Sequence, residues 1–269
     1  MNLAVAGLRT QALSQYRQAA RRGAWLACTV LLTVIASAAY VGLFDLQRFV
    51  DAGPSMVVLA REMFPPNFTN WQSWIKPLLD TLAMSVAGTA IAVVLSLPLG
   101  LLGAYNVSPN AVTHKLARGL LNLLRSVPEL IMGIVFVAAV GFGALPGVLA
   151  LGLHSVGMVG KFFAEAIEHV DQAPIEAVRA AGGSPLQVIT HGILPQVIPQ
   201  LGDISIYRWE YNFRASTVMG MVGAGGIGFE LMGSLRIMQY DEVSAILLVI
   251  LAMVTLVDSL STRLRKAFK

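Results

Sequence analysis

Uncharged apolar stretches recur along the chain and alternate with segments that carry the charge. Residues 24–44 and 81–104 contain no charged side chain, and each is long enough as a helix to cross a hydrocarbon core of roughly 30 Å. Residues 130–160 are also uncharged, but glycines and Pro146 interrupt them, so we expect two helices joined by a tight turn. A last apolar stretch covers residues 243–260. The pattern predicts an all-α protein embedded in a membrane.

The segment at residues 203–222 is apolar enough to cross a membrane but carries charge. It contains Asp203, Arg208, Glu210 and Arg214, and a charge at mid-bilayer costs roughly 3 kcal/mol on insertion scales. Surrounding helices would shield such groups, and Arg208 and Glu210 are close enough in sequence to share a polar pocket. The alternative is a helix at the cytoplasmic surface.

The basic residues at the two ends favour a crossing at this segment. Residues 1–23 hold four arginines and residues 261–269 hold four basic residues, with no acidic residue in either. Because Lys and Arg are enriched on the cytoplasmic side, we expect both ends there, which requires an even number of crossings. Six helices satisfy this, at residues 24–44, 81–104, 127–142, 147–166, 203–222 and 243–260.

This topology divides the chain into five parts. They are a cytoplasmic N-terminal tail (1–23), a first transmembrane helix (24–44), an extracytoplasmic loop (45–80), a five-helix core (81–260) and a cytoplasmic tail (261–269). The loops at 105–126 and 167–202 then face the cytoplasm. Ala36-Ser37-Ala38 resembles a signal-peptide cleavage site, but the apolar run continues beyond it and cleavage would leave an odd number of crossings, so we expect the first helix to be retained.

The composition supports a membrane protein. Hydrophobic residues make up 56% and charged residues 13% of the chain, against roughly 25% charged residues in soluble domains. A disordered chain would need the opposite balance. The single cysteine, Cys28, excludes a disulfide framework, and the scattered histidines lack metal-ligand spacing, so we expect no metal site. The histidines are His114, His154, His169 and His191.

The cytoplasmic stretch 167–202 carries signals for two short helices. Pro174 suits the first turn of a helix, and Gly182-Gly183 provides the left-handed end of that helix. Ser184 is a candidate N-cap, with Pro185 at the first helical position and Gln187 completing a capping box.

The second of these helices is expected to run from residue 185 until Pro195 and Pro199 disturb it. Two capped helices at a sharp angle would form a rigid knob that projects into the cytoplasm. A plain loop between two spans is the alternative, but such loops are usually shorter and less carefully capped. We therefore interpret this stretch as a docking element.

The sequence offers no catalytic constellation. No serine has a nucleophile-elbow context, and no pair of acids is placed for acid–base chemistry. Residues 223–228 match GxGxxG, but a dinucleotide site requires a preceding strand and a βαβ unit, and neither is predicted. Gly223, Gly225, Gly226 and Gly228 are better read as a helix end, a close helix contact or a gate. If this membrane bundle, with its interior charges and cytoplasmic knob, is a transporter, it needs a partner that hydrolyses nucleotide. No nucleic-acid partner is expected.

Residues 176–195, EAVRAAGGSPLQVITHGILP, resemble the EAA loop of ABC importer permeases. Val178 stands where the family has a third alanine, and Gly192 stands where it has an isoleucine. The resemblance implies that this loop contacts an ATPase and transmits its motion. The residues assigned to this coupling loop are Glu176, Ala177, Arg179, Ala181, Gly182, Gly183, Ser184, Leu194 and Pro195.

Three further segments resemble the phosphonate ABC transporter permeases: RSVPEL (125–130), GKFFAEAIEHVD (160–171) and RWEYNFRASTVMGMVGAGGIGFEL (208–231). The resemblance implies a six-helix MetI-like permease bundle that works as a homodimer in a bacterial plasma (inner) membrane. It also implies two cytoplasmic ATPase subunits, which would hold ATP and Mg²⁺, and an extracytoplasmic phosphonate-binding protein. This chain itself would need no cofactor and would not be an enzyme.

A phosphonate, phosphate or phosphite ion needs a cationic or hydroxyl-lined passage. The candidates are Arg208, Glu210, Arg214, Ser216 and Thr217, all on the fifth span. The structural alternative is an Arg208–Glu210 ion pair, with Arg214 reaching an interface. Other functions left open are an ABC permease for methionine or glycine betaine, an ion-driven secondary transporter, and an assembly protein without transport activity.

Overall fold

The computed structural model describes the backbone of residues 2–266 and the side chains of Tyr16 and residues 20–266. Within that range every regular element is a helix, which confirms the predicted fold class. The chain forms two compact units, Met1–Arg61 and Glu62–Lys269. The side chains of Arg9, Arg17 and Lys269, part of the basic pattern at the two ends, lie outside the described residues.

The first unit contains two helices, α1 (Asn2–Tyr40) and α2 (Leu46–Glu62). The part of α1 that is long and apolar enough to cross a membrane is Ala20–Tyr40. This stretch begins before residue 24 and ends before residue 44, so it is shifted toward the N-terminus relative to the expected span 24–44. The helix α2 lies within the segment expected to be an extracytoplasmic loop, and none of its residues is buried.

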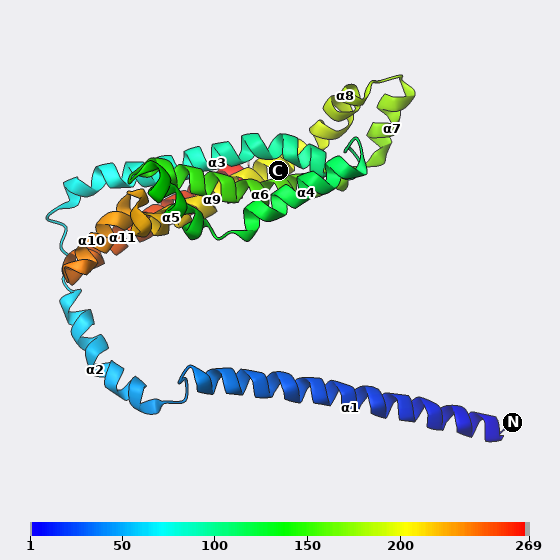
Figure 1. Ribbon diagram of the computed structural model, residues 1–269, viewed down its shortest axis with the longest axis horizontal. Helices are drawn as coiled ribbons and strands as arrows, with labels where there is room; N and C mark the ends of the chain where they lie inside the picture. Colours follow the sequence, from blue (N-terminus) through cyan, green and yellow to red (C-terminus); the bar gives the residue numbers. More distant parts are fainter. Residues whose placement is uncertain (1, 267–269) are drawn as a thin grey trace. The chain divides into compact units, whose positions relative to one another are not determined.

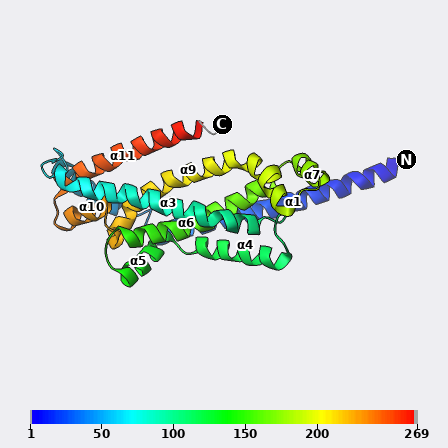
Figure 2. The same cartoon turned by 90° about the horizontal axis from the view of Figure 1, so that it is seen from above.

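The second unit is a bundle of helices (Figures 1 and 2). After a short 3-10 helix at Trp71–Trp74, its elements are α3 (Ile75–Gly103), α4 (Ala111–Ser126), α5 (Glu129–Val140), α6 (Ala144–Glu168), α7 (Gln172–Ala180), α8 (Pro185–Gln187), α9 (Leu194–Met219), α10 (Ile227–Arg236) and α11 (Tyr240–Lys266). Helices α3 and α6 pack along each other most extensively. Helices α7 and α8 project at one end, and α10 lies at the other (Figure 1).

The number of possible crossings agrees with the six expected. In the described part of the chain four helices are long and apolar enough to span a membrane, and the number rises to six if each of two bent pairs is one span. One pair is α4 with α5, bent by 84°, and the other is the Pro185–Ala224 helix with α10, bent by 57°.

The segment 105–126, expected to be a cytoplasmic loop, contains a helix. Residues 111–126 form α4, which packs along α6 and α3, while α5 has only 12 residues. The basic residues of α4 suggested a solvated loop, but Ala117 and Leu121 are buried on its other face. The helix stops before Pro128, because a proline disfavours helical geometry at the preceding residue.

Glycine in α6 allows α4 to approach closely. A Cβ atom at Gly157 would lie 2.6 Å from the backbone nitrogen of Arg125 and 2.7 Å from the carbonyl oxygen of Leu121. At the end of the contact, Arg118 donates to Glu168 Oε1 and, through Nε, to the carbonyl oxygen of Gly103, both at 2.7 Å. These contacts fix α4 to α3 and α6.

The prolines at 195 and 199 do not end the second short helix, contrary to expectation. Residues Val188–Ile193 are π-helical and continue directly into α9, so within Pro185–Ala224 the chain is helical from Pro185 to a kink at Gly223. Pro199 lies inside α9, and Pro195 is the second residue of α9, directly after the π-helical turn. A π-helical turn changes the hydrogen-bond register before it, and this lets the chain pass the proline.

We call residues 172–193, from the start of α7 to the end of the π-helical turn, the elbow. The largest group of buried apolar side chains joins the elbow to the bundle. Ile175, Val188 and Ile193 come from the elbow, whereas Leu121 and Phe163 come from α4 and α6. The elbow is therefore part of the folded core and not an independent loop.

Candidate functional site

The elbow is held in shape by its own helix caps. Asp171 Oδ1 accepts from the backbone N–H of Ala173 at 3.1 Å and begins α7. Gly182 has a φ angle of +80° and ends it. Ser184 and Gln187 form the expected capping box, with the Ser184 N–H donating to Gln187 Oε1 at 2.8 Å and the Gln187 N–H donating to Ser184 Oγ at 3.4 Å. The local helix signals read from the sequence are confirmed.

The two arms of the elbow are also fixed to each other. Ile175 is buried against Gly192, where a Cβ atom would lie 3.3 Å from the Cα of Ile175. Gln196, in the first turn of α9, accepts from the N–H of Asp171 at 3.0 Å and donates to the carbonyl oxygen of Gly192 at 2.6 Å. A force applied to α7 is therefore passed to α9 through packed side chains and short hydrogen bonds.

The tip of the elbow is open to a partner. The predicted coupling residues Glu176, Ala177, Arg179, Ala181, Gly182, Ser184 and Pro195 are exposed, and Gly183 and Leu194 are half-buried. Leu186, which the sequence reasoning did not select, is 70% exposed on α8. A cavity of about 320 Å³ lies between the elbow and Asn106 and Val107.

Arg208 and Glu210 do not share a pocket, so the proposed ion pair between them is wrong. Two residues apart on an α-helix, their side chains point about 200° apart. Arg208 is buried on one side of α9, where its Nε donates to Ser155 Oγ at 2.7 Å. Glu210 faces α11 on the other side and accepts from Ser261 Oγ at 2.9 Å.

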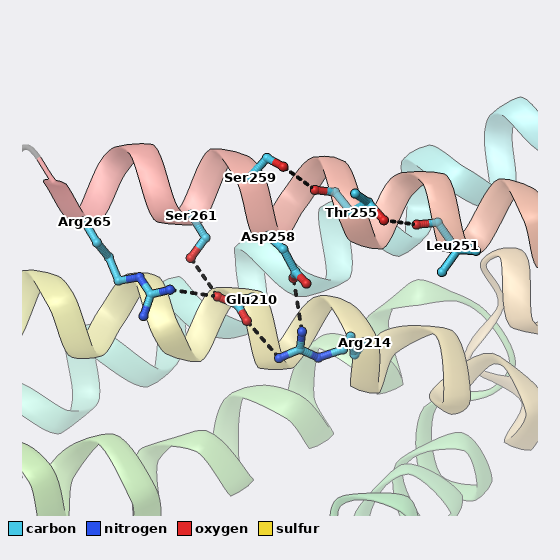
Figure 3. Close-up of polar contacts among 8 residues, drawn as sticks. All are labelled: Glu210, Arg214, Leu251, Thr255, Asp258, Ser259, Ser261 and Arg265. Atoms are coloured by element: carbon cyan, nitrogen blue, oxygen red, sulfur yellow. Dashed lines mark hydrogen bonds and ion pairs between the residues drawn. The ribbon is translucent and has the colours of Figure 1, made fainter.

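The side of α9 that faces α11 carries a network of ion pairs (Figure 3). Glu210 pairs with Arg214 at 3.0 Å and with Arg265 at 3.4 Å, and Arg214 also pairs with Asp258 at 3.1 Å. Arg214 and Asp258 have 43% and 42% of their side chains exposed in the single chain. The network ties α9 to α11 with two positive and two negative groups.

The opposite side of α9 carries a second polar group, which we call the Arg208 cluster: Arg208, Tyr211, Glu129 and His154. The Arg208 guanidinium carbon lies 4.2 Å from the centre of the Tyr211 ring. The Tyr211 hydroxyl donates to Glu129 Oε1 at 2.8 Å, and His154 Nε2 lies 3.4 Å from Glu129 Oε2. The cluster joins α5, α6 and α9.

Around the Arg208 cluster a chain of hydrogen bonds continues into the core. Ser155 Oγ donates to Asn212 Oδ1 at 3.0 Å, and Asn212 Nδ2 donates to Thr89 Oγ1 at 2.9 Å. Ser155 and Asn212 are completely buried, and Thr89 is nearly so. This chain fixes the depth of α9 against α3 and α6, and with it the position of the Arg208 side chain.

Ser216 and Thr217, also predicted to line a substrate path, serve packing in this structure. Ser216 is buried and its hydroxyl donates to the carbonyl oxygens of Phe213 at 2.7 Å and Thr81 at 3.2 Å. The Thr217 hydroxyl donates to the carbonyl oxygen of Arg214 at 2.7 Å. Of the five predicted path residues, Arg208 lies apart from Glu210 and Arg214, and the two hydroxyls face the helix backbone.

The glycine-rich segment after α9 reverses the chain. Gly223, Gly225 and Gly226 have φ angles of +100°, +73° and +72°, values that favour glycine. At Gly228 a Cβ atom would collide with the carbonyl oxygen of Thr217, so α10 packs directly on the end of α9. The readings as a helix end and a close helix contact are confirmed, and the gate stays a prediction.

Several residues of these sites were missed from sequence. Asp258 interrupts the last apolar stretch, and this single charge is a signal that a partner lies across from it. Glu129 and Tyr211 had no such signal, because their contact depends on the bend before α5. In the part of the chain that the structure describes, no three His, Cys, Asp or Glu residues form a group able to hold a metal ion.

Comparison with known proteins identifies the family. Residues 96–269 match the model of binding-protein-dependent transport system inner membrane components. The phosphite transport system permease protein PtxC of Stutzerimonas stutzeri is 72% identical over 230 residues, which cover 86% of this chain and 84% of that protein. The putative cryptic phosphonate transport system permease protein PhnE2 of Escherichia coli K12 is 46% identical over 120 residues, which cover 45% of this chain and 98% of that protein.

Among solved structures, an inward-facing form of the MetNI methionine ABC transporter matches with a TM-score of 0.63 and 22% identity. The match covers 73% of this chain and 96% of the other, and at this identity it shows the fold alone. The family settles the choice among an ABC permease, a secondary transporter and an assembly protein. The chain belongs to the binding-protein-dependent transport system inner membrane components, the multi-pass permease subunits of ABC importers, which work with a separate ATPase and a substrate-binding protein.

Proposed function

We propose that two copies of this chain form the membrane-spanning part of an ATP-driven importer for phosphorus oxyanions. Phosphite is the first substrate to test, and phosphonates and phosphate are further candidates. The name of the 72% identical relative supports phosphite. A phosphonate-binding or phosphite-binding protein outside the membrane would deliver the ion, and two ATPase subunits inside would hold ATP and Mg²⁺.

The single observation that carries this proposal is the helical run that begins at Pro185 and continues to the kink at Gly223, within the Pro185–Ala224 segment. It begins in the exposed elbow, passes the charged residues of α9 and ends in the glycine-rich turn. Closure of the ATPase subunits would move the elbow, and because the elbow is packed on the bundle the motion would reach α9 as a whole. The elbow then has to lie on the cytoplasmic side, with both chain ends.

The ion pairs between α9 and α11 support a second copy. Arg214 and Asp258 lie within candidate spans and are more than two-fifths exposed in the single chain. Charges facing lipid at that depth are costly, so this face needs a cover of protein or water. A second copy of the chain, with an aqueous path between the two, would supply both.

The test is uptake by the whole transporter in proteoliposomes, with the ATPase and the binding protein present. We expect ATP-dependent uptake of phosphite that phosphonate and phosphate reduce by competition, and that methionine and glycine betaine leave unchanged. Uptake or stimulated ATP hydrolysis with methionine alone would overturn the proposed substrate class and leave the family assignment in place.

A further inference from the structure

Arg208 is a buried cation without a counter-ion at contact distance. Its side chain is 5% exposed, and among the described residues it forms no ion pair. Its Nε donates to the neutral hydroxyl of Ser155, while its Nη2 is buried and has no hydrogen-bond partner in the described part of the chain. A buried guanidinium N–H without an acceptor is costly, and it is aimed at a place where an acceptor would be stabilised.

The second arginine of α9 is a contrasting case. Arg214 is bound by two carboxylates, those of Glu210 and Asp258. An anion approaching Arg214 has to displace these groups and faces their negative charge. Arg208, which points about 120° away from Arg214 around the helix, keeps hydrogen-bonding capacity for an incoming oxyanion.

The groups next to Arg208 provide a second donor. The Tyr211 ring lies under the guanidinium, and its hydroxyl is a donor that is now used by Glu129 Oε1. Glu129 is the first residue of the short helix α5, and its other oxygen faces His154. The Nδ1 of His154 lies 3.0 Å from the carbonyl oxygen of Val127. The Glu129 carboxylate thus occupies a donor site that suits an oxyanion.

A cavity borders this cluster at His154. It has a volume of about 530 Å³ and is lined by His154 together with Asn122, Arg125, Ser126 and Met158, at the bend between α4 and α5. Its polar lining includes the cation Arg125. An anion in this cavity would lie beside His154, whose Nε2 is 3.4 Å from Glu129 Oε2.

We propose that the Arg208 cluster is an intramembrane binding site for the transported phosphorus oxyanion, in which Glu129 acts as a tethered competitor. The oxyanion accepts from Arg208 Nη2 and from the Tyr211 hydroxyl after the Glu129 carboxylate has left that hydroxyl. Glu129 then stays beside His154. This inference rests on the proposed function.

The competition gives a test that misfolding cannot imitate. Binding of inorganic phosphite is measured on the permease–ATPase complex in nanodiscs without binding protein, and phosphite uptake is measured on the complete transporter. The variants are Tyr211→Phe, which removes one hydroxyl and keeps the ring under Arg208, Arg208→Lys, and Glu129→Gln. The control is Tyr207→Phe, the same change one turn earlier on α9 at a half-exposed tyrosine.

We expect Tyr211→Phe and Arg208→Lys each to weaken phosphite binding by roughly tenfold, the effect of one hydrogen bond to a charged group. Glu129→Gln removes the competing charge and should tighten binding by roughly tenfold. Tyr207→Phe should bind as the wild type does, and assembly with the ATPase should be the same for all four variants.

The outcomes separate this inference from the proposed function. Suppose that the wild-type transporter takes up phosphite. If Tyr211→Phe and Tyr207→Phe then bind phosphite equally, or if Glu129→Gln weakens binding, the proposed site is wrong and the proposed function stands. If the complete wild-type transporter takes up no phosphorus oxyanion, the proposed function fails and this site fails with it.

Discussion

Arg208 and Arg214 show how position on one helix decides what a charged residue can do. They are six residues apart on α9, yet one is buried against α6 through Ser155 and the other is held by carboxylates of α9 and α11. The sequence placed both in one candidate path because it shows charge and not direction. Their different surroundings favour a binding role for Arg208 and a structural role for Arg214.

At the same scale, the absence of a side chain at Gly157 holds α4 on α6. Gly157→Ala places a Cβ atom within 2.6 Å of the backbone of Arg125, so α4 has to move outward. We expect a loss of stability of about 1–3 kcal/mol, as for other overpacked sites, seen as a lower melting temperature of the detergent-solubilised permease. Gly119→Ala on α4 is the matched control, because nothing lies within 4 Å of its Cβ position. Equal melting temperatures for the two variants would contradict the close contact.

At the scale of elements, the elbow depends on one left-handed residue. Gly182 has a φ angle of +80° and no heavy atom of this chain within 4 Å of its Cβ position, so within the chain a substitution acts first on the backbone. Gly182→Val should strain the turn by about 1–2 kcal/mol, whereas Gly182→Asn, which tolerates this conformation, should not.

The readout for Gly182 is the amount of substrate moved per ATP hydrolysed by the complete transporter. We expect the valine variant to insert and assemble but to transport less per ATP, while the asparagine variant behaves as the wild type does. A valine variant with normal coupling would show that the shape of the elbow does not carry the motion.

Elements with strong local signals were predictable, and those set by packing were not. The capping box at Ser184 and the stop at Gly182 follow from residues a few positions apart, and both are present. The helix α4 was missed because its buried face, with Leu121, is apparent only when α6 lies against it. The sequence also did not predict that the helix continues through Pro195, because a π-helical turn cannot be recognised from residue types.

The site was predictable in part for the same reason. The coupling residues lie together because they are neighbours in sequence, and their exposure follows from the polar pattern of α7. Asp258 and Arg265 meet Glu210 and Arg214 across two helices (Figure 3), and the contact of Glu129 with Tyr211 joins positions far apart in the chain. Such contacts depend on how the helices pack, which one sequence does not display.

In the whole molecule, one helical run links the two ends of the bundle. The elbow lies at one end and the glycine-rich turn with α10 at the other (Figure 2), and the Pro185–Ala224 run passes from one to the other. The Arg208 cluster and the ion pairs to α11 lie on opposite sides of this run. A movement of the elbow would therefore act on both groups at once, which is what a permease driven by a separate ATPase requires.

The most direct measurement is the side of the membrane on which the elbow lies. The single cysteine, Cys28, is first replaced by serine, and Leu186→Cys then introduces a thiol at the exposed tip of the elbow. A maleimide that cannot cross membranes is applied to inside-out and to right-side-out vesicles. The account predicts labelling in the inside-out vesicles alone. Labelling in right-side-out vesicles would put the elbow beyond the reach of any cytoplasmic ATPase and would contradict the account.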